Sequence, residues 1–239
     1  MVQGDKLFRR VGVLGGMGPE ATVLLMQRLI AAVPATDDAD HIPLIVDQNP
    51  QVPSRLRRLI DGTGDDPGPV LAAMAQRLQA AGALALAMPC NTAHHYAPAI
   101  RAAVSIPLLD MVALSVMHAQ GLAGPGGKVG ILASPAVRQI GLFDAALVAA
   151  GLVPLYAEED AAMLAIIRRI KAGGPDDTSR AELRAESSGL LARGAIVQMI
   201  GCTEFSLIAG ATDPGAQAFD TLDCLVQAIL TFATAEQAA

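Results

Sequence analysis

Short apolar runs alternate with longer segments of helical periodicity along most of the 239-residue chain. The apolar runs predict strands at residues 11–14, 43–47, 84–88, 107–109, 128–132, 152–156 and 196–200. The helical periodicity predicts helices at residues 21–33, 67–81, 94–104, 143–150, 160–171, 178–193 and 222–232. Strands that alternate with helices favour α/β architecture, with parallel sheets covered by helices on both faces.

Two sequence patterns occur twice, in the same order. RVGVLG at residues 10–15 resembles KVGILA at 128–133, and GALALAMPCNT at 82–92 resembles GAIVQMIGCTE at 194–204. Both copies of the longer pattern carry a cysteine at the same place, Cys90 in one and Cys202 in the other. A chance likeness of two αβ units is the alternative, but the shared cysteine favours a duplication.

The repeats predict two pseudo-symmetric α/β domains, each a parallel sheet flanked by helices, with an active site in the cleft between them. The turn-forming stretches GPGG at 124–127 and TDPG at 212–215 are the best candidates for boundaries. We expect residues 1–115 and 216–239 to form the first domain and residues 116–215 the second, because the last helix needs an apolar partner beyond the second repeat.

Composition excludes several classes of protein. Hydrophobic residues make up 52% of the chain, too many for a disordered protein. The charge-free stretch at residues 80–100 is broken by Gly82, Pro89 and Pro98 and does not predict a membrane-spanning helix. The net charge of -6 and the absence of Trp argue against nucleic-acid binding.

The cysteine content and the N-terminal segment indicate a compartment. The three cysteines are widely spaced and imply no disulfide framework. The first residues lack the long apolar core of a signal peptide. We therefore expect a reducing, cytoplasmic setting with free thiols and no membrane partner.

Cys90 and Cys202 each follow a predicted parallel strand, where ligand sites of open α/β sheets form. Facing domains would bring them to opposite walls of one cleft. The polar residues that follow them are Asn91, Thr92, Thr203 and Glu204. Their N–H groups and hydroxyls suit a carboxylate ligand, and such surroundings favour a reactive thiolate. One such cysteine alone is more often a buried structural thiol, but the symmetric pair favours a site. Cys224 lies within the predicted last helix, has no such polar residues after it, and is expected to be structural.

Metal binding is not predicted, because no CxxC or Cys/His ligand spacing occurs and His94 and His95 are adjacent. His94 has two readings that stay open. In one it contacts the ligand or orders the turn after Cys90. In the other it is a helix-start histidine that hydrogen-bonds the backbone.

The glycine-rich turn after the first strand also has two readings. GMGPEA at residues 16–21 fits a dinucleotide fingerprint, and Asp47 at the end of the next strand is a candidate ribose ligand. However, Pro19 lacks an N–H donor and Glu20 adds negative charge where a pyrophosphate would lie. We favour a tight turn over a small carboxylate, closed by Met17, and expect no cofactor.

Four motifs together resemble the aspartate racemase branch of the aspartate/glutamate racemase superfamily. They are VLGGMGP at 13–19, NPQVPSR at 49–55, MPCNTAH at 88–94 and GCTE at 201–204. The resemblance extends over residues 11–220. It implies two pseudo-symmetric α/β domains, a reaction without pyridoxal phosphate or metal, and a homodimer.

The resemblance also implies roles for individual residues. Cys90 and Cys202 would be the two acid/base thiols, Arg55 would bind a substrate carboxylate, and Lys171 in IKAG would be the second cation. The other expected substrate-binding residues are Met17, Gln51, Asn91, Thr92, Ser134 and Thr203. The chain departs from the family at 134–137, where SPAV replaces Thr-x-Gly-Thr and puts Val137 in place of a hydroxyl. Ser54 stands where the family often has Asp.

The expected function is therefore inversion of the α-carbon of a small acidic amino acid, aspartate ahead of glutamate, by proton transfer between Cys90 and Cys202. A maleate-isomerase-like or decarboxylase-like enzyme is one alternative, and two retained thiols argue against its single-cysteine chemistry. A non-catalytic carboxylate-binding protein is the other alternative.

Overall fold

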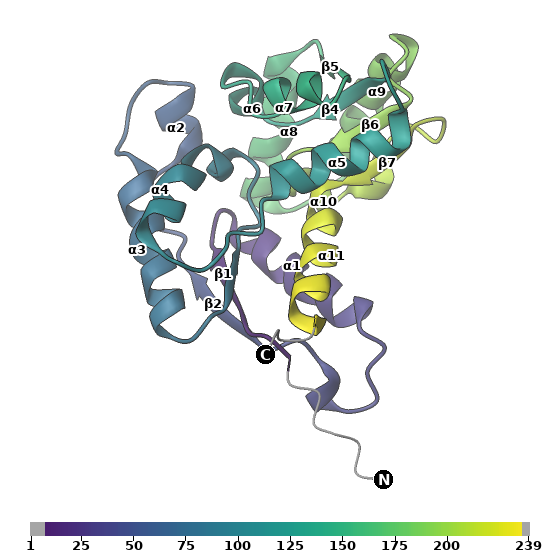
Figure 1. The fold of residues 1–239 in the computed structure, drawn as a ribbon. Helices are drawn as coiled ribbons and strands as arrows, with labels where there is room; N and C mark the ends of the chain where they lie inside the picture. The colour runs from purple at the N-terminus through teal and green to yellow at the C-terminus, as the bar shows by residue number, and fades with distance from the viewer. Residues whose placement is uncertain (1–7, 236–239) are drawn as a thin grey trace.

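The computed structural model describes residues 8–235 (Figure 1). The strands are β1 Val11–Gly15, β2 Leu44–Gln48, β3 Ala85–Ala87, β4 Lys128–Leu132, β5 Val153–Tyr156, β6 Val197–Ile200 and β7 Gln217–Asp220. The α-helices are α1 Pro19–Ala32, α2 Arg55–Leu59, α3 Pro67–Ala80, α4 Ala97–Ala103, α5 Met111–Ala123, α6 Pro135–Gln139, α7 Asp144–Ala149, α8 Asp160–Gly173, α9 Asp177–Ala192, α10 Thr203–Ser206 and α11 Thr221–Thr234. Short 3₁₀ helices are η1 Asp38–Asp40, η2 Thr92–Tyr96 and η3 Ala209–Ala211.

The strands form two parallel sheets, in the orders β2-β1-β3 and β5-β4-β6-β7. Each repeated RVGVLG-type segment forms an inner strand of its sheet, β1 or β4, and each repeated cysteine follows the neighbouring strand, β3 or β6. The predicted strand at 107–109 is reduced to one parallel bridge between Leu86 and Leu108. That bridge lies beside β3 as β7 lies beside β6, so the two halves share one topology. The predicted fold class of two parallel sheets flanked by helices is confirmed.

Alternate residues of each central strand face different helical layers. In β1, Leu14 packs in a cluster with α3, whereas Val13 packs with α1 and α11. In β4, Leu132 packs with α8 and α9, whereas Ile131 packs with α7 and α5. Both faces of both sheets are therefore buried, which explains why the strands read as continuous apolar runs.

The last helix of each half crosses to the other half (Figure 1). Helix α5 follows the first sheet in the chain, yet Val116 and Ala119 pack against β4 and β6. Helix α11 follows β7, yet Leu225 and Ile229 pack against β1 and α1. The two crossing helices also contact each other. This exchange ties the two sheets into one body.

The predicted domain boundaries stay a prediction, and the structure describes how the chain passes between the sheets. Strand β7, at 217–220, pairs with β6 of the second sheet, and α11 then returns to the first sheet. Helix α5 begins before residue 115 and packs mainly on the second sheet. Within residues 8–235, no helix combines the length and apolar character needed to cross a bilayer.

Candidate active site

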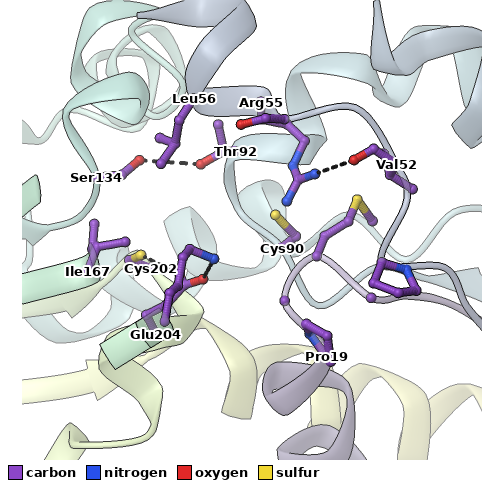
Figure 2. Close-up of a pocket in the computed structure, with 16 residues that line it drawn as sticks. Pro19, Val52, Arg55, Leu56, Cys90, Thr92, Ser134, Ile167, Cys202 and Glu204 are labelled. Carbon is purple, nitrogen blue, oxygen red and sulfur yellow. Dashed lines mark hydrogen bonds and ion pairs between the residues drawn. The ribbon is translucent and has the colours of Figure 1, made fainter. Parts of the chain in front are cut away.

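A cavity of about 310 Å³ opens where the carboxyl ends of the two sheets meet (Figure 2). Its lining includes residues from loops that follow β1, β2 and β3 of the first half and β4 and β6 of the second, together with α8. The lining residues are Gly16, Met17, Gly18, Pro19, Pro50, Val52, Ser54, Arg55, Leu56, Cys90, Thr92, Ser134, Ile167, Lys171, Cys202 and Glu204. Figure 2 shows the two cysteines on different sides of this cavity, one from each half.

The glycine turn after β1 forms one wall. Gly16 has a φ of 91°, and a Cβ there would lie 2.4 Å from the backbone carbon of Asn49, so only glycine fits. The Gly16 N–H donates to Thr22 Oγ1 over 3.0 Å, which joins the turn to α1. Asp47 was the candidate ribose ligand if this turn bound a dinucleotide. In the structure it forms an ion pair with Arg77 at 2.7 Å.

Arg55 is held with part of its guanidinium unpaired. It is the first residue of α2, which Ser54 caps by accepting a hydrogen bond from the Arg57 N–H. Its Nη1 donates to the carbonyls of Val52 and Pro53, at 3.2 and 3.0 Å. No described residue accepts a hydrogen bond from its buried Nε. The guanidinium is thus oriented beside the cavity with a donor left for an anion.

Cys90 lies after β3 and is only 7% exposed. His94, one turn later, holds the Cys90 loop. The Met111 N–H donates to His94 Nε2 over 3.2 Å, so the proton of the neutral ring is on Nδ1, which donates to the Cys90 carbonyl over 2.8 Å. Burial lowers the pKa of His94 and keeps the ring neutral. His94 is therefore the backbone-bonded histidine, and the same bonds order the turn after Cys90, whereas His94 is not among the residues that line the cavity.

Cys202 lies after β6 and is 6% exposed, with a carboxylate beside its sulfur. Its Sγ lies 3.0 Å from Glu204 Oε2 and donates to it, and the other oxygen of Glu204 forms an ion pair with Lys171 of α8. Burial, reinforced by the Glu204 charge, raises the pKa of Cys202 well above its ordinary value. Burial alone would lower the pKa of Lys171, but Glu204 outweighs it and holds that pKa above its ordinary value.

Hydroxyl groups from the two halves meet at the cavity. Thr92 Oγ1 and Ser134 Oγ lie 3.4 Å apart (Figure 2). Val137, the position of the missing family hydroxyl, is fully buried in the core behind α6 and does not line the cavity. The lining thus retains hydroxyl donors although the sequence departs from the family there.

The structure brings most of the predicted site residues together but leaves three outside the lining. Asn91 is buried, and its Nδ2 donates to Thr221 Oγ1 over 2.9 Å instead of facing the cavity. Gln51 is exposed in the turn after β2, where its N–H donates to Asn49 Oδ1. Thr203 is buried beside a neighbouring cavity. Their predicted contact with a ligand does not follow from their positions.

Glu204 lines the cavity and touches a candidate thiol, yet it was absent from the predicted substrate-binding residues. Its signal in the sequence was its place two positions after Cys202, where the first repeat has Thr92. A carboxylate so close to a repeated cysteine is chemically significant, because it changes the proton affinity of the thiol.

Known proteins share this fold and part of this sequence. Residues 14–229 match the Asp/Glu/Hydantoin racemase family. A Picrophilus torridus aspartate racemase superposes with a TM-score of 0.84 at 21% identity, covering 94% of each chain. An aspartate racemase homologue from Pyrococcus horikoshii OT3 has a TM-score of 0.72 at 19% identity, covering 95% of this chain and all of that one.

The broad specificity amino-acid racemase RacX of Bacillus subtilis (strain 168) is 28% identical over 141 residues. The matched segment is 57% of this chain and spans only 60% of that relative. The structural likenesses establish the fold, and the family match extends over most of the sequence. The chain therefore belongs to the Asp/Glu/Hydantoin racemase family.

Proposed function

We propose that the protein is a cofactor-independent amino-acid racemase that inverts an acidic amino acid, aspartate ahead of glutamate. The observation that carries this proposal is the pair of repeated cysteines, Cys90 and Cys202, which line one cavity from the two halves of the chain. Inversion of a carbon centre needs a base on one face and an acid on the other, and two thiols so placed supply both.

The proposed reaction is a two-base proton transfer. One thiolate removes the α-proton, and the opposite thiol gives its own proton to the other face of the same carbon. Charge that develops on the substrate carboxylate meets the hydroxyls of Thr92 and Ser134 and the guanidinium of Arg55. The reverse reaction exchanges the roles of the two sulfurs.

The charges of the lining support a carboxylate substrate in a protein whose net charge is -6. Arg55 and Lys171 are the cations that line the cavity, and Glu204 is the anion. Arg55 has an unpaired donor for the α-carboxylate. A second carboxylate would bind Lys171 in competition with Glu204.

The test is a panel of single enantiomers incubated with the purified protein and followed by circular dichroism. We expect the signals of L- and D-aspartate to decay to zero, those of glutamate more slowly, and those of alanine and serine slowest. Neutral substrates belong in the panel because the Bacillus subtilis relative has broad specificity by name. Faster turnover of the neutral substrates would overturn the acidic preference.

The same assay separates the alternatives. A non-catalytic carboxylate-binding protein would bind aspartate in calorimetry and leave its optical signal unchanged. A maleate-isomerase-like or decarboxylase-like enzyme would leave amino acids unchanged and convert maleate or a substituted malonate instead. Either outcome would replace the racemase proposal.

The homodimer and the cytoplasmic setting also remain proposals. An apolar groove of about 820 Å³ between α5 and α11 offers a surface for a second copy, and Met117 on its rim is 66% exposed. Light scattering after gel filtration tests the dimer, and a monomer across the working concentration range would contradict it.

A further inference from the structure

The two repeated cysteines have different partners. In the first repeat the position two residues after the cysteine is Thr92, whose hydroxyl lies beside Ser134. In the second repeat that position is Glu204, whose carboxylate lies beside the sulfur of Cys202. The duplication therefore preserved the sulfur positions but placed an acid at only one of them.

Glu204 is fixed by both of its oxygens. Oε2 lies 3.0 Å from Cys202 Sγ (Figure 2). Oε1 pairs with Lys171 Nζ. The side chain of Glu204 is only 12% exposed, so water screens this contact weakly. The ammonium occupies Oε1, and Oε2 accepts the S–H of Cys202.

The charged groups around Cys202 come from both halves. Glu204 on α10 and Lys171 on α8 lie on its own side of the cavity, and Arg55 on α2 and Cys90 line the same cavity from the first half. Glu204 touches the sulfur and raises the pKa of Cys202, whereas the Lys171 ammonium, which pairs with Glu204, lowers that pKa by less. The charged group closest to the Cys202 sulfur is therefore the negative carboxylate of Glu204.

We propose that Glu204 is a positioning residue that keeps Cys202 in its thiol form in the free enzyme, so that Cys202 acts as the acid and Cys90 as the base in the first turnover. This inference rests on the proposed two-base function and adds a direction to it. The raised pKa of Cys202 agrees with this assignment.

The proton balance follows from this assignment. The Cys90 thiolate takes the α-proton, and the electron pair of the C–H bond stays on the substrate. Cys202 then gives its proton to the opposite face and becomes a thiolate, while Cys90 is now a thiol. Repulsion between that new thiolate and Glu204 favours return of a proton from water to Cys202, and Cys90 loses its proton to water.

The test measures thiolate directly by alkylation with iodoacetamide at pH 7, with each cysteine read by peptide mass spectrometry. In the wild-type protein we expect Cys90 to react faster than Cys202. In Glu204→Gln the rate at Cys202 should rise at least about tenfold, the change in thiolate fraction for one pKa unit, with little change at Cys90. Glu204→Asp, which keeps the charge, should restore slow alkylation of Cys202.

The matched control is Glu182→Gln. Glu182 lies on α9, and its carboxylate pairs with Arg169 of α8, the helix that also carries Lys171. This variant should leave the Cys90-to-Cys202 ratio unchanged. If Glu204→Gln does not fold, the pH dependence of the wild-type protein decides instead, because Cys202 should begin to react only at a higher pH than Cys90.

Equal wild-type rates at the two cysteines, or an unchanged Cys202 rate in folded Glu204→Gln, would overturn the assignment. Alkylation needs no turnover, so the result is independent of the racemase assay. Absence of racemisation by the wild-type protein would reject the proposed function even where the alkylation pattern is as expected.

Discussion

The loops that carry Cys90 and Cys202 occupy equivalent places in the two halves but are held by different contacts. The Cys90 loop is anchored through its backbone, because His94 binds the Cys90 carbonyl and the start of α5. The Cys202 loop instead has Glu204 on the sulfur itself. Duplication thus supplies the two-sided geometry, whereas later divergence of neighbouring residues can give each thiol its own part in a reaction.

The most disruptive way to test this comparison removes one sulfur at a time. Cys90→Ser and Cys202→Ser should each lower racemisation by at least about 10²- to 10⁴-fold, the range of general acid–base catalysis, because inversion needs both groups. Circular dichroism of aspartate measures the loss. Cys224→Ser, in α11 and outside the cavity lining, should retain activity.

The same two variants sharpen the comparison in D₂O. Cys202→Ser should still exchange the α-proton of the enantiomer that presents it to Cys90, which NMR detects as loss of the α-proton signal. Cys90→Ser should exchange the opposite enantiomer more slowly, because Cys202 is held as a thiol. Undiminished racemisation by either variant would contradict the two-base mechanism.

The cations from the two halves differ as the thiols do, since Arg55 has an unpaired donor and Lys171 is already paired. Arg55→Ala should raise KM for aspartate by about 10- to 100-fold, because a hydrogen bond to a charged group contributes about 1.5–3 kcal/mol. Steady-state kinetics measures the effect. Arg57→Ala, an exposed neighbour on α2, is the control, and an equal change in both variants would remove Arg55 from the site.

His94 makes stability depend on pH in the acidic range, whereas the raised pKa of Cys202 acts only at alkaline pH. Because the folded protein holds His94 neutral, the unfolded chain binds a proton more readily below its ordinary pKa of 6.5. The contribution of His94 to stability is therefore present above that pH and declines as the pH falls below it. Thermal unfolding at pH 7.5 and 5.5 should show a larger loss for the wild-type protein than for His94→Gln.

The smallest effect is expected at a residue that the sequence placed in the site and the structure does not. Gln51→Ala should change KM and kcat by less than about twofold, because its exposed side chain lies outside the cavity lining, and such surface substitutions change even the free energy of unfolding by no more than about 0.5 kcal/mol. Parallel kinetics with Arg55→Ala provides the scale. A KM change comparable to that of Arg55→Ala would return Gln51 to the binding site.

The sheets were predictable because their signals are local and repeated. Each inner strand is a short apolar run between turns. Val11 and Val13 belong to one such run, and Val129 and Ile131 belong to the other. Helix α5 was missed because its residues are apolar on nearly every side, so no periodic face is visible. Strand β7 and the short helices α2, α6 and α10 were missed because four or five residues carry too little periodicity.

Only the features of the candidate site that local sequence patterns reveal could be predicted. The place of both cysteines at strand ends follows from the repeats. The contact of Asn91 with Thr221 joins residues 130 positions apart, and no local pattern reveals it. The approach of Glu204 to Cys202 depends on side-chain orientation and on Lys171 from another helix, which are properties of the assembled fold.

The exchange of α5 and α11 has a consequence for how the protein folds. Each sheet keeps part of one apolar face uncovered until a helix encoded at the end of the other half arrives, so neither half is complete by itself. Contacts this distant in the chain slow folding and couple its parts, and we infer a single cooperative melting transition for both sheets. A free-standing half of the chain would have to cover its sheet by trading its last helix with a second copy, as domain-swapped dimers do.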